Sequence, residues 1–353
     1  MRRISLRGFV VLFTGLVLGL AAAAIASKPT AEGASRGRIV FDRGGDVWGE
    51  GASIWTVGGN GVGLAQLTHP PKRTGDGEAT WSPDRSRIAF VRSVRIGEDF
   101  HGDPVYRGDL MVMGADGRGL RRLVADLNQG IPLWSPNGRR IAYRRGAWEI
   151  WTVGSDGTGA QMLVRGHTSD DPSWSPDGRE IAFTRYTGFR AEAWVINARG
   201  GGPKKLIPQF RDSVVDVPVA WSPSGREIAF LGYPLPFGST SLYVLNRPTG
   251  SIRKLVSGTS GARQITGMQS NIPEWSPDES KLFISLGEDD KASTFVVDAA
   301  GGGLRKVATG SGCPEWSPDG RSIAYVRHGS LYVVSAAGGT AKLIARGVNC
   351  IDW

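Results

Sequence analysis

Long stretches free of glycine and proline are missing from this sequence. Its 353 residues include 51 glycines and 20 prolines, and after Pro29 no stretch without either exceeds thirteen residues. Glycine and proline destabilise helix interiors, and parallel sheets need crossover connections that are usually helical. Helix bundles and doubly wound α/β folds are therefore excluded. A hydrophobic content of 40% still supplies a sizeable core, so an all-β fold is favoured.

Long hydrophobic runs are also missing, apart from the uncharged residues 8–26. Three arginines precede this run and Ala-Ile-Ala ends it at Ala26, which is the layout of a secretory signal. The run is also close to the length that spans a bilayer, so an uncleaved anchor is the alternative. We expect a signal peptide or membrane anchor at 1–26, a linker at 27–36, and an exported folded part, periplasmic or extracellular, at 37–353.

Basic residues do not gather in long blocks. The formal net charge is +9, and the three N-terminal arginines account for a third of it. Because exported chains rarely meet nucleic acid and no long Lys/Arg run is present, nucleic acid is excluded as a partner. We expect a monomer that contacts a membrane only through its N-terminal segment.

One repeated unit dominates the rest of the sequence. A Trp-Ser-Pro motif followed by a short apolar run occurs six times, at spacings of 40 to 54 residues that suit four short strands per repeat. The copies are WSPDRSRIAF at Trp81, WSPNGRRIAY at Trp134, WSPDGREIAF at Trp174, WSPSGREIAF at Trp221, WSPDESKLFI at Trp275 and WSPDGRSIAY at Trp316.

Each repeat predicts a four-stranded antiparallel meander. Strand A ends in the tryptophan. Ser-Pro-Asp-Gly then forms a tight turn, because proline presets the second position and glycine accepts the strained fourth. Strand B is Ile-Ala-Phe or its equivalent. Strand C and a glycine-rich turn to strand D follow, as in 110–113 and 120–123.

The two ends of the chain complete one another. Residues 38–41, 53–57 and 64–67 match strands B, C and D without a strand A before them, and Trp353 stands where the next repeat tryptophan belongs. One strand from the C-terminus and three from the N-terminus make a seventh sheet and leave no open edge. The sequence therefore predicts an all-β, seven-bladed β-propeller of four-stranded antiparallel blades, closed when the C-terminal strand joins the N-terminal blade.

The W-S-P-D-G-x-x-I-A-F pattern resembles the repeat of TolB-type β-propellers, relatives of the WD-repeat class, over nearly the whole chain after residue 36. TolB itself is similar only in its propeller, which has six blades and follows an α/β domain that 27–36 cannot supply. Related propellers of prolyl-oligopeptidase-like enzymes sit beside a hydrolase domain, and this sequence has no G-x-S-x-G elbow. The resemblance implies a stand-alone propeller of the cell envelope.

The aligned tryptophans are predicted to be structural. A side chain at one strand position in every blade faces a neighbouring blade, where its burial stabilises the ring. The alternative is that they stack on a sugar or a cation. They are Trp81, Trp134, Trp174, Trp221, Trp275, Trp316 and Trp353.

Basic residues recur on the outer strand D of the repeats, for example Arg121, Lys204 and Arg305. We interpret them as protection of an exposed sheet edge against pairing with other chains. An electrostatic rim for anionic lipid or wall polymer is the alternative.

Cysteine is rare, with two residues, and both have the same place in the repeat. Cys313 lies three residues before Trp316, and Cys350 lies three before Trp353. Innermost strands are the closest parts of adjacent blades, and an exported protein meets an oxidising compartment. We predict a Cys313–Cys350 disulfide, with two buried free thiols as the alternative.

Meander topology sorts the connections into two ends of the ring. The A-to-B and C-to-D turns are short and repetitive, whereas the B-to-C loops and D-to-A links are irregular, as in 93–109 and 208–217. Variable loops on a rigid scaffold commonly carry binding. This loop face and the adjoining channel mouth are the candidate binding surface.

Histidine is scarce, and all of it falls on the loop face. Imidazole and carboxylate side chains there could hold a divalent metal, and some propeller-fold pectate-type lyases use a His-bound metal. No H-x-H or H-E-x-x-H spacing supports such a site, so we expect no cofactor and keep a divalent metal at the channel mouth as the alternative. The candidate residues are His69, His101, His167, Asp170, Asp171 and His328.

Three carboxylates precede the repeat tryptophan in three consecutive blades. Glu274, Glu315 and Asp352 would form an acidic arc on the innermost strands, able to hold a cation or a basic peptide segment. Ion pairing of each with a neighbouring arginine is the alternative.

The sequence favours an exported, non-catalytic binding scaffold that presents its loop face and channel mouth to an envelope protein or peptide. No set of nucleophile, base and oxyanion donors is identifiable. The alternatives are an exported metal-dependent polysaccharide lyase or hydrolase with its site at the channel mouth, and a carbohydrate-binding module.

Overall fold

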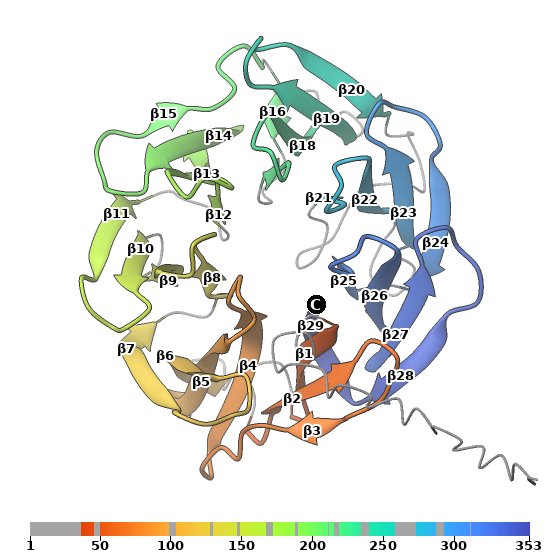
Figure 1. Cartoon of the computed structure of the whole chain (residues 1–353). Helices are drawn as coiled ribbons and strands as arrows, with labels where there is room; N and C mark the ends of the chain where they lie inside the picture. Colours follow the sequence, from red (N-terminus) through yellow and green to blue (C-terminus); the bar gives the residue numbers. More distant parts are fainter. Residues whose placement is uncertain are drawn as a thin grey trace, which may run out of the picture.

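Seven sheets stand around a central opening (Figure 1). The computed structural model describes residues 37–45, 50–98, 104–127, 130–146, 149–166, 172–187, 190–210, 212–214, 219–233, 240–257, 273–286, 293–310 and 312–353. Within these ranges the elements are all strands, and a search of them finds no helix with the length and apolar character of a membrane span. The predicted seven-bladed β-propeller is confirmed.

The blades are numbered along the chain, and each is given from its innermost strand outward. Blade 1 contains β29 (Val348–Asp352), β1 (Arg38–Arg43), β2 (Ser53–Gly58) and β3 (Ala65–Gln66). Blade 2 contains β4 (Thr74–Trp81), β5 (Arg87–Glu98), β6 (Pro104–Gly114) and β7 (Arg121–Leu127). Blade 3 contains β8 (Leu133–Trp134), β9 (Arg140–Arg145), β10 (Glu149–Gly154) and β11 (Gln161–Arg165).

Blade 4 contains β12 (Ser173–Trp174), β13 (Glu180–Thr187), β14 (Arg190–Asn197) and β15 (Lys204–Lys205). Blade 5 contains β16 (Ser213–Val214), β17 (Ala220–Trp221), β18 (Glu227–Tyr233), β19 (Ser241–Asn246) and β20 (Ile252–Val256). Blade 6 contains β21 (Glu274–Trp275), β22 (Lys281–Leu286), β23 (Ser293–Asp298) and β24 (Arg305–Thr309). Blade 7 contains β25 (Gly312–Trp316), β26 (Ser322–Arg327), β27 (Ser330–Ser335) and β28 (Lys342–Arg346).

The Ser-Pro-Asp-Gly turns join strands A and B as the sequence predicts. In blade 4, Ser175 donates its hydroxyl to Asp177 Oδ1 at 2.6 Å and accepts the N–H of Glu180 at 2.9 Å. Asp177 also accepts the N–H of Arg179 at 3.0 Å. Gly178 has a φ of 68°, which glycine adopts without strain. The same side-chain contacts recur in blades 6 and 7.

The hydrophobic core is divided among the junctions between blades. In strand B, successive side chains point to opposite faces of the sheet. A neighbouring blade covers each of the two faces. In blade 2, Ile88 and Phe90 pack toward blade 1, whereas Ala89 and Val91 pack toward blade 3. Seven such clusters fill the seven junctions.

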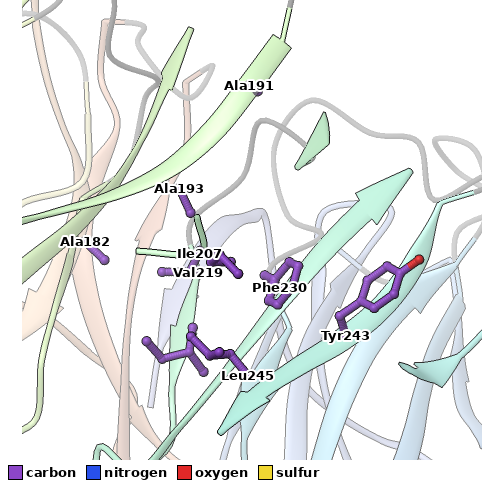
Figure 2. Close-up of a cluster of buried hydrophobic side chains, with 9 residues drawn as sticks. Ala182, Ala191, Ala193, Ile207, Val219, Phe230, Tyr243 and Leu245 are labelled. Atoms are coloured by element: carbon purple, nitrogen blue, oxygen red, sulfur yellow. The ribbon is translucent and has the colours of Figure 1, made fainter. Parts of the chain in front are cut away.

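Small residues of one blade meet large residues of the next. At the junction of blades 4 and 5, Ala182 and Ala193 belong to the same buried cluster as the rings of Phe230 and Tyr243 (Figure 2). The Phe230 and Tyr243 rings stack with centroids 5.5 Å apart. Fully burying a side chain such as Phe230 contributes about 1.5–3 kcal/mol, so each junction holds its two blades together.

The repeat tryptophans link the innermost strands. In four blades the indole N–H donates to the backbone oxygen of the residue that precedes the tryptophan in the previous blade, which supports the structural interpretation. The pairs are Trp134 with Thr80 (3.3 Å), Trp174 with Leu133 (3.1 Å), Trp275 with Ala220 (3.1 Å) and Trp316 with Glu274 (3.2 Å). Among the described residues, the indole N–H groups of Trp81, Trp221 and Trp353 have no acceptor.

The two chain ends close the ring. Strand β29 pairs antiparallel with β1, with Ile351 opposite Phe41 and Asp352 opposite Val40. The predicted disulfide is present, and it joins Cys313 of β25 in blade 7 to Cys350 of β29 with a Cα–Cα distance of 5.7 Å. Both the sheet pairing and the disulfide therefore fix the last strand.

Basic residues at the start of strand D also bridge blades, a role that the edge-protection interpretation missed. Each donates to a backbone carbonyl in the next blade's C-to-D turn. The contacts are Arg121 to Ser155 and Asp156, Arg253 to Ala299, Arg305 to Ala336, and Lys342 to Asn60. These contacts form an outer girdle around the ring.

Both segments named above as irregular contain strand. Residues 93–98 and 104–109 extend the β5–β6 hairpin, and β16 adds a fifth strand to blade 5. Residues 91–96 include the β-branched Val91, Val94 and Ile96, residue types that favour strands.

Replacing Cys313 and Cys350 by serine is expected to lower the free energy of unfolding by about 2–4 kcal/mol, because the unfolded chain gains the freedom that the cross-link removes. Urea unfolding of the oxidised wild type and the variant measures the difference. The reduced wild type is the control and should match the variant; equal stability of all three would contradict the prediction.

Trp275→Phe is expected to cost about 1 kcal/mol more than Trp81→Phe. Both indoles are buried, at 5% and 6% exposure, but only Trp275 donates to a carbonyl among the described residues. Denaturant midpoints of the two variants provide the test, since the loss of ring volume is common to both. Equal losses would show that the inter-blade hydrogen bond adds nothing.

Candidate functional site

A cavity of about 460 Å³ lies against the innermost strands of blades 3 to 6. Its wall is mostly apolar, because proline and tryptophan side chains of the A strands and A-to-B turns contribute most of it. The residues that precede the repeat tryptophans also line it. In ring order these are Leu133, Ser173, Ala220 and Glu274.

In two blades the side chain before the tryptophan contacts the next blade. Thr80 Oγ1 donates to the Pro132 carbonyl at 2.8 Å, and Ser173 Oγ donates to the Val219 carbonyl at 2.8 Å. Strands β21, β25 and β29 place Glu274, Glu315 and Asp352 at this same position in blades 6, 7 and 1. The residue before the repeat tryptophan is therefore acidic in three consecutive blades and neutral in the other four.

The three carboxyl groups influence one another. Burial raises the pKa of Glu274 to about 8, and the nearby charge of Asp352 adds to the rise. Burial also raises the pKa of Glu315, with further contributions from Glu274 and Asp352. Asp352 has a raised pKa from burial, although Arg85 and the N–H of Trp81, donated at 2.6 Å, favour its ionised form. Glu274 therefore retains its proton at neutral pH.

Arg85 belongs to this acidic arc, and sequence reasoning missed it. Its guanidinium lies 5.5 Å from the Trp81 ring centroid and donates to the Arg38 carbonyl at 3.3 Å. The charges of Asp352 and Glu315 favour its ionised form, although burial lowers its pKa overall. Arg85 is thus close enough to influence two of the three carboxylates, and ion pairing of each carboxylate with an arginine stays a prediction.

Arg85 replaces the turn glycine of the repeat and has a φ of 59°. Glu279 takes the same position in blade 6 at a φ of 60°, and its carboxylate accepts hydrogen bonds from Ser224 in the turn of the preceding blade. Arg85 instead donates to Arg38 of blade 1, which has no A-to-B turn because the chain ends meet there. The signal available in the sequence was Asp-Arg in place of the usual Asp-Gly.

Asp42 is a buried carboxylate outside the acidic arc, and sequence reasoning missed it as well. It is 1% exposed on β1 and accepts the side-chain N–H of Asn349 at 2.8 Å. Burial raises its pKa to about 6, against the lowering effect of its hydrogen bonds. The sequence does mark this residue. Asp42 follows Ile-Val-Phe in strand B of blade 1, at the position where other B strands have an apolar residue such as Val91 or Leu231.

The structure does not bring the described histidines together. His69 lies on the link between β3 and β4, and His328 lies between β26 and β27; both are exposed. A search of the described residues finds no group of three His, Cys, Asp or Glu side chains that could hold a metal ion. His101, His167, Asp170 and Asp171 lie outside the described residues, so the metal alternative stays a prediction.

The fold and this channel define the class to which the chain is similar. No protein-family model matches the chain, and no curated protein matches it. Among solved structures, TolB from Acinetobacter baumannii has a TM-score of 0.53 at 18% identity, covering 90% of this chain and 82% of its own. The chain thus has the fold of TolB-type β-propellers.

Enzymes share the same architecture. An oligogalacturonate lyase in complex with manganese has a TM-score of 0.62 at 15% identity, covering 80% of this chain and 82% of its own. A prolyl endopeptidase has a TM-score of 0.61 at 13% identity, where 92% of this chain covers 50% of that one. At these identities the likeness concerns the fold, and function has to be argued from the site.

Glu274→Gln is expected to reduce the dependence of stability on pH between about 4.5 and 8. In that window the folded wild type keeps a proton that the unfolded chain releases, so its stability falls as pH rises, by up to about 1.4 kcal/mol per pH unit for one proton. Urea midpoints across this range measure the slope.

The variant should be the more stable protein at pH 8. Glu98→Gln, on the exposed end of β5, is the matched control and should keep the wild-type profile. If the stability of the Glu274→Gln variant falls with pH as steeply as that of the wild type, another group holds the proton.

Proposed function

We propose that this protein is an exported, non-catalytic binding scaffold of the cell envelope, whose channel receives a peptide segment of a partner protein. The observation that carries the proposal is the two-sided channel wall. Glu274, Glu315 and Asp352 lie on one arc, and an apolar cavity faces the channel on the other. A segment with one cationic and one apolar side chain complements both halves.

The geometry of the cavity supports this function. Its volume of about 460 Å³ falls within the range of ligand pockets, roughly 300–1,000 Å³. Its walls are innermost strands fixed by the tryptophan hydrogen bonds and seven apolar junctions. A rigid site loses little conformational entropy on binding, which favours affinity.

The N-terminal sequence and the disulfide support export. Residues 1–26 have the layout of a secretory signal. The Cys313–Cys350 bond belongs to an oxidising compartment, as exported proteins encounter.

Ala220→Phe is expected to weaken peptide binding about tenfold or more, because the added ring fills the apolar half of the cavity. A library of extended peptides that vary in basic and apolar content is screened on the wild type, and selected peptides are titrated by fluorescence polarisation. Ala160→Phe, on an exposed C-to-D turn, is the matched control and should bind as the wild type does. Glu315→Gln should weaken only peptides with a basic residue.

Several outcomes would overturn the proposal. Selected peptides without basic or apolar preference would contradict the two-sided site, as would binding that survives Ala220→Phe but is lost when residues 96–105 are shortened. Stoichiometric divalent metal in the purified protein, with cleavage of a polyuronic oligosaccharide, would favour the lyase alternative. Oligosaccharide binding without cleavage would favour a carbohydrate-binding module.

A further inference from the structure

Four arginines occupy one equivalent position around the turn face, the end of the ring that carries the A-to-B and C-to-D turns. Arg139, Arg179, Arg226 and Arg321 each follow the turn glycine at the foot of strand B in blades 3, 4, 5 and 7, and all four side chains are exposed. We call them the arginine ring. Strand B is the second strand from the channel, so the ring surrounds the channel mouth at this end.

Edge protection does not explain these residues. Strand B is hydrogen-bonded on both sides, as β13 is to β12 and β14, so no open sheet edge lies beside Arg179. The guanidinium groups of Arg139, Arg226 and Arg321 also lack a hydrogen bond or ion pair within the described part of the chain, unlike the bridging arginines of the outer girdle. They are available to an external anion.

The acidic residues of the same turns accept hydrogen bonds within those turns. Asp319 Oδ1 accepts the Ser317 hydroxyl at 2.6 Å and the N–H of Arg321 at 3.0 Å. Asp278 makes equivalent contacts, and they lower its pKa to about 2. These carboxylates stabilise the turns, whereas the guanidinium groups extend beyond them.

Charge is unevenly divided between the two ends of the ring. The turn face consists of the A-to-B turns, the C-to-D turns and the first residues of strands B and D. In these segments basic residues outnumber acidic ones roughly two to one. Toward the loop face, the described residues carry about equal numbers of each. The turn face is therefore the cationic side of the disc.

The chain also enters the ring at this face. Gly37 immediately precedes β1, whose first residue Arg38 lies at the same end as the A-to-B turns. Only residues 27–36 separate it from the apolar run that ends at Ala26, and ten residues span at most roughly 35 Å. An anchored N-terminus would hold the turn face within that distance of a bilayer.

We infer that the turn face docks on anionic phospholipid headgroups, with the arginine ring contacting lipid phosphates and the loop face directed away from the membrane. Guanidinium pairs with phosphate through two parallel hydrogen bonds, and basic groups near an anionic bilayer are attracted within a Debye length. This surface extends membrane contact beyond the N-terminal segment. It also leaves the loop face open to partners, although the inference does not depend on the proposed peptide function.

The test uses the chain from Ser27, which retains every strand of the closed ring. Its binding to vesicles of equal phosphatidylglycerol and phosphatidylcholine is measured by co-sedimentation, beside vesicles of phosphatidylcholine alone. The wild type should bind only the anionic vesicles, and binding should weaken about tenfold or more between about 50 and 300 mM salt.

Two variants with the same change in net charge separate the faces. Replacing all four residues of the arginine ring by glutamate should reduce binding about tenfold or more, while the matched loop-face variant should stay within about twofold of the wild type. The loop-face set, all exposed in the structure, is Lys72, Arg107, Arg327 and Arg346, each replaced by glutamate. Thermal unfolding confirms that both variants are folded.

Hydrogen–deuterium exchange then reports the orientation. Vesicles should protect the turn-face peptides 135–141 and 197–205 and leave the tip of the β5–β6 hairpin unprotected. Equal loss of binding in both variants would show a response to net charge alone and would overturn the inference. Absence of wild-type binding would also overturn it, as would stronger binding to a soluble phosphate polymer than to vesicles, which would assign the face to a wall polymer.

Discussion

Hydrogen bonding between β29 and β1 is the contact on which the rest of the structure depends. Without it, β1 would have an unpaired edge, and the apolar faces that meet around Phe41 and Ile351 would be exposed. Each blade is too thin to bury its own side chains, so its stability comes from its two neighbours. Closure gives every blade both neighbours, and the Cys313–Cys350 disulfide ties β29, the last strand of the chain, to β25 of blade 7.

Closure also produces the asymmetry of the channel. Six blades have an A-to-B turn, but blade 1 has none, and the space beside its missing turn is occupied by Arg85. The same blade contributes Asp352, which accepts the N–H of Trp81 and raises the pKa of Glu315. Arg85 therefore lies next to the closure and close to Asp352.

Much of the fold was predictable because the same short-range chemistry is repeated. The turn needs Gly178 at positive φ and Asp177 to accept two hydrogen bonds, and these demands appear directly in the sequence. The length of the β5–β6 hairpin was not predictable from the repeat, because strand pairing beyond the ring depends on which residues find a partner. The outer girdle was missed for a related reason: Arg121 reaches carbonyls of the next blade, which sequence spacing does not reveal.

The sequence by itself determined the number of blades, the closing strand, the disulfide and the place of the acidic residues in the repeat, because periodicity assigns each residue a strand and a face. Only the tertiary structure determined the burial and the neighbouring charges of those residues. Glu274 acquires a pKa of about 8 because two folded blades bury it near another carboxyl group. The two-sided cavity likewise arises from residues far apart in the chain, since a channel wall exists only when innermost strands of several blades surround one space.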